Sequence, residues 1–254
     1  MRIFDLSSPL DPASGDPLPP RIDYRDHKEN VPHLARLLGV PESEVPDGLG
    51  SATETVTART HNGTHMDAPW HFFPTSEGRP ARTIDEIPLE WCYAPGVVLD
   101  FSHLPPGTEI SAADVEEAAA RLPQPIEPGN IVFIRTDAYK YYYHPDYPKM
   151  HAGMSREATL WLIERGVKVM GIDAWSWDLP LPMQGERYLR SENKDPNMLW
   201  GAHRVAKERE YVHLEQLANL DKLPRPYGFI ASVFPIKVAR GSGGWVRAVA
   251  IFND

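Results

Sequence analysis

The 254-residue sequence predicts a mixed α/β or α+β fold. Apolar, β-branched runs outnumber segments with helical periodicity, and strand–helix–strand alternation occurs between residues 130 and 173. Hydrophobic residues make up 42% of the chain and charged residues 24%, which is typical of a globular protein and not of a disordered one. Because no linker composition divides the chain, we expect one domain that spans residues 1–254.

Six segments are expected to form strands, because they are short, apolar and rich in β-branched residues. They are residues 53–60, 96–101, 130–136, 167–173, 228–235 and 246–252. Three segments are expected to form helices, namely residues 111–122, 155–165 and 197–210. Ser111 and Ser155 stand where an N-cap would be, and Asp114 suits a first helical turn.

The charge and cysteine content exclude several classes of function. There are 26 basic and 35 acidic side chains, with no basic run, so a nucleic-acid partner is not expected. No apolar stretch approaches the length of a membrane span, and the N-terminus lacks the apolar run of a signal peptide. We therefore expect no membrane partner and a cytoplasmic protein. The single cysteine, Cys92, leaves a metal site to nitrogen and oxygen ligands.

The most informative stretch runs from residue 59 to residue 73 and contains His61, His65, Asp67 and His71. Imidazole and carboxylate groups suit zinc, manganese or iron(II). His65 and Asp67 share a face if the chain is extended, and a turn at Gly63 would bring His61 toward them. Three protein ligands would leave an open position for water, which is the arrangement of a catalytic metal site.

His71 has two possible roles. It could be a fourth ligand, or it could be a general base shielded from water by the aromatic flanks Trp70 and Phe72. A second group of candidate ligands lies further along the chain, where His203, His213 and Glu215 could complete one site or build a second one. The spacing of the residues does not decide between the two roles of His71, or between His203 and His213.

The run His-Asn-Gly-Thr-His-Met-Asp-Ala-Pro-Trp-His, residues 61–71, resembles the H-x-G-T-H-x-D-x-P-x-H signature of the metal-dependent cyclase-like hydrolases. This family includes bacterial kynurenine formamidases, isatin hydrolases and a trans-dienelactone hydrolase. The segment 4–10 resembles the family's first strand, and Gly171-Ile-Asp173 resembles its G-x-D strand end. His203 and Glu215 match the spacing of its second ligand pair.

The resemblance implies a role for each residue of these motifs. His61, His65 and Asp67 would bind a first ion, Asp67 would bridge to a second ion held by His203 and Glu215, and His71 would carry protons. It further implies zinc or manganese, with two ions per subunit because position 215 is a glutamate, and a swivelling β/β/α domain. Family members form homodimers or homotetramers, so the proline-rich segment of residues 11–50 is expected to contact a neighbouring subunit.

Two features of the sequence bear on the substrate. After Gly171-Ile-Asp173 the chain reads Ala-Trp-Ser-Trp-Asp instead of the formamidase Thr-Pro-Ser-Val-Asp, and the segment 179–196 with Arg187 and Arg190 is longer than expected. Trp70, Trp175 and Trp177 are candidate walls of a pocket for an aromatic small molecule, and either arginine could pair with a substrate carboxylate.

The function that follows is hydrolysis of a small amide, cyclic amide or lactone by metal-activated water, with His71 as acid and base. A lyase or cyclase acting on a small carbonyl compound is the alternative, and a non-enzymatic metal-binding module is a third hypothesis.

Overall fold

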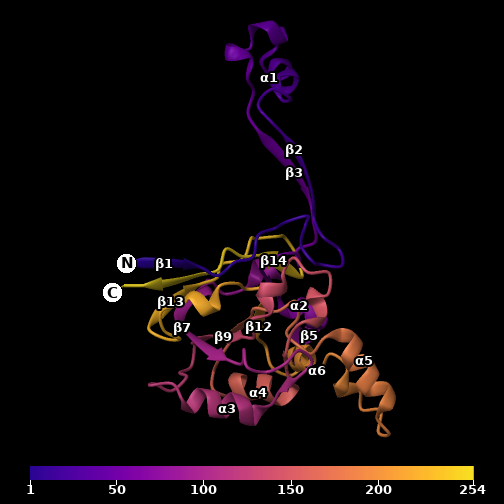
Figure 1. Cartoon of the computed structure of the whole chain (residues 1–254), viewed down its shortest axis with the longest axis vertical. Helices are drawn as coiled ribbons and strands as arrows, with labels where there is room; N and C mark the ends of the chain where they lie inside the picture. The colour runs from indigo at the N-terminus through magenta and orange to yellow at the C-terminus, as the bar shows by residue number, and fades with distance from the viewer. Residues whose placement is uncertain (254) are drawn as a thin grey trace.

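The computed structural model describes residues 1–253 and is built on a curled nine-stranded sheet (Figure 1). In spatial order its strands are β1 (Arg2–Asp5), β15 (Val249–Phe252), β13 (Phe229–Ser232), β7 (Tyr93–Asp100), β9 (Ile131–Arg135), β11 (Val169–Ile172), β12 (Val212–Glu215), β4 (His65–Asp67) and β14 (Gly243–Trp245). The four strands from β7 to β12 are parallel, whereas the strands at both ends pair antiparallel.

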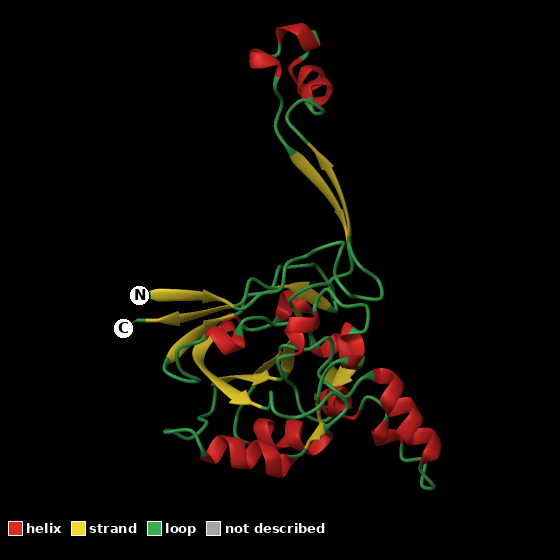
Figure 2. Ribbon diagram, in the orientation of Figure 1, coloured by secondary structure: helices red, strands yellow, loops and turns green. Residues whose placement is uncertain are grey.

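Apolar side chains cover both faces of the central strands, which accounts for their nearly continuous hydrophobic sequence. In β9, Val132 and Ile134 belong to one core cluster, and Ile131 and Phe133 belong to the other. The first cluster includes residues of α3 (Ala112–Ala120) and α4 (Arg156–Glu164), which lie together along one face of the sheet (Figure 2). The mixed α and β fold predicted from the sequence is confirmed.

The remaining helices and strands lie outside the main sheet. The helices are α1 (Val31–Leu38), α2 (Pro69–Phe72), α5 (Leu181–Arg190) and α6 (Gly201–Arg204). Three two-stranded sheets pair β8 (Glu109–Ile110) with β10 (Gly153–Met154), β5 (Thr75–Ser76) with β6 (Arg79–Pro80), and β2 (Arg21–Arg25) with β3 (Thr53–Thr57). Within residues 1–253, no helix has the length and apolar character needed to cross a membrane.

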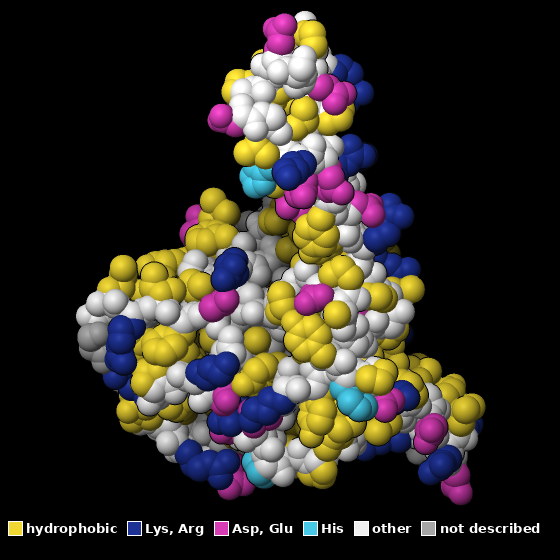
Figure 3. All heavy atoms as spheres, turned by 45° about the horizontal axis from the view of Figure 1, so that its top comes forward, with side chains coloured by type: hydrophobic (Ala, Val, Ile, Leu, Met, Phe, Trp, Pro, Cys, Tyr) yellow, Lys and Arg dark blue, Asp and Glu magenta, His cyan; other side chains and the backbone are white. Residues whose placement is uncertain are grey.

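An arm made of β2, α1 and β3 projects away from the rest of the molecule (Figure 1). Every residue of β3 is exposed, and large apolar side chains such as Tyr24, Leu37 and Leu38 are exposed along the arm. Figure 3 shows hydrophobic side chains along this arm between charged ones. The strand expected at residues 53–60 therefore exists, but it belongs to the arm and not to the main sheet.

All six expected strands form, five of them within narrower bounds than predicted and β7 with an earlier start at Tyr93, and the first two expected helices form as α3 and α4. The hydroxyls of Ser111 and Ser155 accept the backbone N–H groups of Asp114 and Ala158, which confirms both N-caps. The prediction of a single helix at residues 197–210 was wrong. A left-handed Trp200, at φ 58°, separates a 3-10 turn at Pro196–Met198 from the four-residue α6.

Candidate metal centre

Two neighbouring antiparallel strands, β4 and β12, set four polar side chains on one face of the sheet. His213 lies opposite Asp67, and Glu215 lies opposite His65. Because alternate residues of a strand point to the same face, His65 and Asp67 project alongside His213 and Glu215. All four residues are buried, so their polar groups must find partners within the protein.

His61, His65 and Asp67 converge as the sequence predicted. The Nδ1 atom of His61 lies 2.7 Å from Asp67 Oδ1, and the Nε2 atom of His65 lies 3.2 Å from the same oxygen. Gly63, at φ 61°, makes the turn that brings His61 back toward Asp67. His65 donates its Nδ1–H to the carbonyl of Gly63 at 2.8 Å, and this fixes its Nε2 lone pair toward the site.

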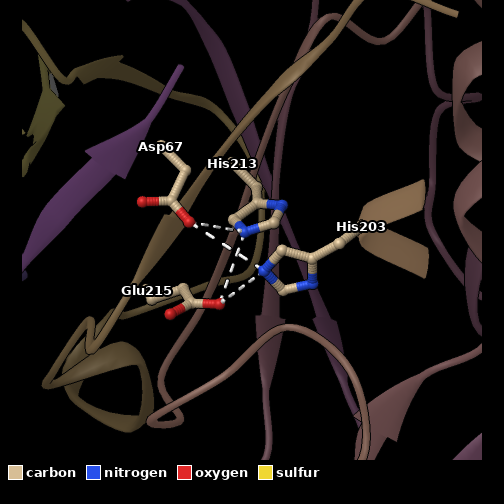
Figure 4. A group of neighbouring side chains, drawn as sticks. All are labelled: Asp67, His203, His213 and Glu215. Atoms are coloured by element: carbon tan, nitrogen blue, oxygen red, sulfur yellow. Dashed lines mark ion pairs between the residues drawn. The ribbon is translucent and has the colours of Figure 1, made fainter. Parts of the chain in front are cut away.

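His203 reaches the same carboxylate from helix α6. Its Nε2 atom lies 4.0 Å from Asp67 Oδ2 and 3.6 Å from Glu215 Oε1 (Figure 4). The buried carboxylate of Asp178 accepts the Nδ1–H of His203 and also the backbone N–H groups of Ala202, at 2.8 Å, and of His203, at 3.1 Å. Asp178 thus fixes the orientation and the tautomer of the His203 ring.

His213 belongs to the same cluster. Its Nε2 atom lies 3.3 Å from both Asp67 Oδ2 and Glu215 Oε1 (Figure 4). The sequence spacing had left His203 and His213 equally eligible, and the resemblance had favoured His203 alone. The structure brings both of them to Glu215, because His213 occupies the next same-facing position of β12.

The cluster has the electrostatics of a cation site. Burial opposes the ionisation of Asp67, but the imidazoles of His71, His61 and His65 outweigh it and hold the pKa of the Asp67 carboxyl well below its usual value. Burial would lower the pKa of His213, but the carboxylates of Asp67 and Glu215 outweigh it and raise that pKa to about 9. The ligand atoms therefore form a pocket that strongly favours positive charge.

The residues present fit a divalent metal. They offer only imidazole nitrogens and carboxylate oxygens, the ligands that zinc and manganese share. Two groups of ligand atoms each lie within 4.8 Å of one another, namely Asp67, His203, His213 and Glu215, and His61, Asp67 and His71. In the described chain, the buried Nε2 atom of His65 also lacks a hydrogen-bond partner, as expected of a lone pair that awaits a cation.

His71 lies beside this cluster at the wall of a cavity of about 360 Å³. Pro69 takes the first position of the one-turn helix α2 and brings His71 Nε2 to 3.6 Å from Asp67 Oδ2. Burial lowers the pKa of His71 to about 4, because the neighbouring carboxylate of Asp67 only partly offsets the loss of solvation.

The cavity is mostly apolar and contains both indole and imidazole walls. Its lining comprises Asp16, Pro17, Leu18, Arg59, His61, Asn62, Asp67, His71, Trp175, Ser176, Leu181, Trp200, His203, Glu215 and Gln216. Trp200 stacks on His203, with 4.6 Å between ring centroids and an interplanar angle of 22°. Trp200 was not predicted as a wall, although its position three residues before His203 could have indicated it.

Of the three tryptophans expected at the pocket, only Trp175 lines the cavity. Trp177 is fully buried and stacks on His213, while its backbone N–H donates to Glu215 Oε1 at 2.7 Å, so it supports the ligands from behind. Trp70 is 45% exposed and lies outside the cavity lining. Arg187 also lies outside it, where it pairs with Glu109 at 3.3 Å.

Part of the proline-rich N-terminal segment closes the cavity of its own chain. Residues 16–18 line the cavity, and the carbonyl of Leu18 accepts the side-chain N–H of Asn62 at 2.9 Å. This segment therefore shapes the site of the same subunit, in addition to supporting the projecting arm.

Comparison with known proteins places this geometry in a family. Residues 4–179 match the cyclase family, whose model carries the description "putative cyclase". The chain is 27% identical over 222 residues to an isatin hydrolase of Roseibium aggregatum, which covers 81% of this chain and 76% of that protein. It is 27% identical over 195 residues to a kynurenine formamidase of Erythrobacter litoralis, which covers 76% of this chain and 74% of that protein.

Solved structures share the fold. Isatin hydrolase A from Ralstonia solanacearum superposes with a TM-score of 0.73 at 24% identity, over 99% of this chain and 92% of that one. An isatin hydrolase bound to the product analogue thioisatinate gives the same TM-score over 98% of this chain and 91% of that one. The family match contains the first histidine cluster and α2, and it ends before His203 and Glu215. On the match of residues 4–179, this chain belongs to the cyclase family of proteins.

Proposed function

We propose that this protein is a metal-dependent hydrolase that cleaves a small aromatic amide, cyclic amide or lactone. The observation that carries the proposal is the convergence of four imidazoles on the carboxylate of Asp67, at the edge of an aromatic-lined cavity; they belong to His61, His65, His203 and His213. The names of the relatives, isatin hydrolase and kynurenine formamidase, denote hydrolysis of small amides and support the same assignment.

His61, His65 and Asp67 would hold a first zinc or manganese ion, and Asp67 would be shared with a second ion near His203 and Glu215. When bound, such ions polarise a carbonyl group and make water a nucleophile at neutral pH. The fixed tautomers of His65 and His203 support this assignment, because each ring keeps a lone pair directed at the shared carboxylate.

His71 is the proton carrier in this proposal. A pKa near 4 keeps its imidazole neutral at pH 7, so it can accept a proton from the attacking water. The proton is then returned to the leaving nitrogen or oxygen. Its position on the cavity wall, 3.6 Å from Asp67 Oδ2, sets it beside the reacting atoms and not behind the ligands.

The substrate is expected to be flat and apolar. Trp175 and Trp200 present indole surfaces to the cavity, and Leu181 adds an aliphatic contact. Aromatic rings favour stacked or edge-on packing against such walls, which gains about 0.5–1.5 kcal/mol beyond the area that is buried. The cavity volume of about 360 Å³ suits a ligand of one or two fused rings.

We further propose a homodimer or homotetramer in the cytoplasm, with the arm as the intersubunit contact. The arm exposes Tyr24, Leu37, Leu38 and Val56, and isolated two-stranded ribbons are marginally stable in water without further packing. Sedimentation of the full chain should show two or four copies. A Leu37→Asp/Leu38→Asp variant should shift the protein toward a monomer, and an unchanged oligomer would rule out the arm as the contact.

Hydrolysis can be tested directly with three probes, namely an aryl formamide, isatin and an aryl lactone, incubated with zinc- or manganese-loaded protein in heavy-oxygen water. Hydrolysis predicts that the carboxylic product of at least one probe carries one labelled oxygen. Turnover without incorporation of the label would favour the lyase or cyclase alternative. No turnover of any probe by protein with full metal content would contradict the proposed substrate class.

A further inference from the structure

His213 is a buried histidine that the family ligand pattern does not use. Its side chain has no solvent exposure and is enclosed by Trp177, Phe72 and Tyr211, with ring centroids 4.9–5.7 Å away. Within residues 1–253, neither ring nitrogen of His213 makes a hydrogen bond of normal geometry. Buried polar atoms nearly always have a bonding partner in folded proteins, so the Nε2 atom of His213, which faces the carboxylates, needs one.

The four side-chain atoms around Glu215 have the spacing of a complete coordination shell. His213 Nε2 lies 3.3 Å from Asp67 Oδ2 and 3.3 Å from Glu215 Oε1. His203 Nε2 lies 3.6 Å from Glu215 Oε1 and 4.0 Å from Asp67 Oδ2. Zinc bonds of about 2.0–2.1 Å in a tetrahedron place neighbouring ligand atoms about 3.4 Å apart. Three of these separations lie within about 0.2 Å of that value and the fourth, between His203 Nε2 and Asp67 Oδ2, is about 0.6 Å longer, so small shifts of the side chains would place all four atoms around one tetrahedral ion.

We propose that His213 is a fourth protein ligand of the second ion, so that Asp67, His203, His213 and Glu215 form a closed shell of two nitrogens and two oxygens. The inference rests on the two-ion site of the proposed function. Four protein ligands are typical of structural zinc sites, which leave no position for water. An ion in this shell would stabilise the fold and the charge of Asp67, and the residues left to hold a water-activating ion would be His61, His65 and Asp67.

The cavity supports this division between the two sides. His61 and His71 are partly exposed and line the cavity, whereas His213 is fully buried and does not line it. The cavity therefore reaches Asp67 from the side of His61 and His71 and also touches His203 and Glu215, whereas His213 lies on the side of the cluster that faces away from the cavity. Asp67 Oδ1 faces His61 and His65, and its Oδ2 faces His213 and also His71.

A protonated His213 could instead replace the second ion as the cation between the two carboxylates. The orientation of His203 argues against this arrangement. Asp178 accepts the Nδ1–H of His203, so His203 Nε2 presents a lone pair to the cluster. A single N–H of His213 cannot satisfy two carboxylates and this lone pair together, whereas one metal ion binds all three.

The inference can be tested by metal binding without any activity assay. We expect equilibrium dialysis to find two zinc or cobalt ions per wild-type chain. A His213→Ala variant should bind one of them more than about 100-fold more weakly, since the loss of an outer-shell partner alone costs 10–100-fold. The absorption spectrum of the cobalt protein should also lose the strong visible bands of a four-coordinate ion. The exposed His144, changed to alanine, serves as the matched control.

Unchanged affinity for both ions together with an unchanged cobalt spectrum in His213→Ala would overturn the inference. If the variant does not fold, nitrogen-15 NMR of the wild-type protein loaded with cadmium-113 decides the question. A one-bond cadmium coupling on the His213 ring is expected, and couplings confined to the other histidines would overturn the inference. A wild-type protein that binds no metal would refute the proposed function itself, which is a separate outcome.

Discussion

Gly243 supports the first ligand group from the edge strand β14, and its replacement by alanine gives a prediction of defined size. A Cβ atom at this position would lie 2.7 Å from His61 Cε1 and 3.0 Å from the carbonyl oxygen of Met66. Restoring an ordinary separation of about 3.5 Å requires a displacement of about 0.8 Å. Metal–ligand distances tolerate deviations of only about 0.2 Å, so His61 would leave its position in the cluster.

The Gly243→Ala variant is therefore expected to bind one of its ions about 10- to 100-fold more weakly than the wild type does. Isothermal titration of the metal-stripped protein with zinc measures this change. Gly185 in α5 is the matched control, because a Cβ there meets nothing within 4 Å. Gly185→Ala should leave metal affinity unchanged and stabilise the protein by about 0.5–1 kcal/mol. Wild-type metal affinity in Gly243→Ala would refute this description of the His61 side.

Four further outcomes are expected. His71→Ala should abolish turnover while metal analysis still finds the wild-type content, and loss of an ion would instead make His71 a ligand. Asp178→Asn should weaken binding of one ion about 10–100-fold in dialysis, because the His203 ring loses its acceptor, and unchanged binding would contradict that role. Zinc affinity should rise between pH 6.5 and 9, because the His65 and His213 rings must each lose a proton before they bind zinc. The neighbouring carboxylates outweigh burial and raise the pKa of both rings, that of His213 to about 9. For the same reason, the free energy of unfolding of the metal-free protein should include the full contribution of these protonated rings below pH 6.5 and lose it toward pH 9. Zinc titrations that release no protons would contradict both expectations.

The local part of the site could be predicted from the sequence, because it depends on short-range geometry. His61, His65 and Asp67 lie within seven residues, and a glycine turn and an extended segment are enough to bring them together. The caps of α3 and α4 were predictable for the same reason, since a serine hydroxyl satisfies a backbone N–H three residues later.

The long-range part could not be predicted from local patterns. His213 joins the cluster because β12 pairs with β4 in a register that sets it opposite Asp67. The spacing of residues along the chain does not predict which strands pair or in which register. Trp200 lines the cavity in place of the predicted Trp177, again because of long-range packing. Trp177 points into the core behind Glu215, and the left-handed backbone of Trp200 turns that indole over His203.

The helix expected at residues 197–210 shows a third kind of failure. Its composition suits a helix, but the buried position of His203 and the hydrogen bonds from Ala202 and His203 to Asp178 impose a short helix that starts at Gly201. Tertiary contacts at the ligand thus override local propensity.

The central claim is that catalysis depends on metal held by the Asp67 cluster. The most direct measurement is the rate of hydrolysis of a responsive aryl amide or lactone while zinc or manganese is returned stepwise to chelator-treated protein. The account predicts that metal-free protein is inactive and that the rate recovers to a plateau as the bound ions are restored. Full turnover by protein in which metal analysis finds no ion would contradict the account.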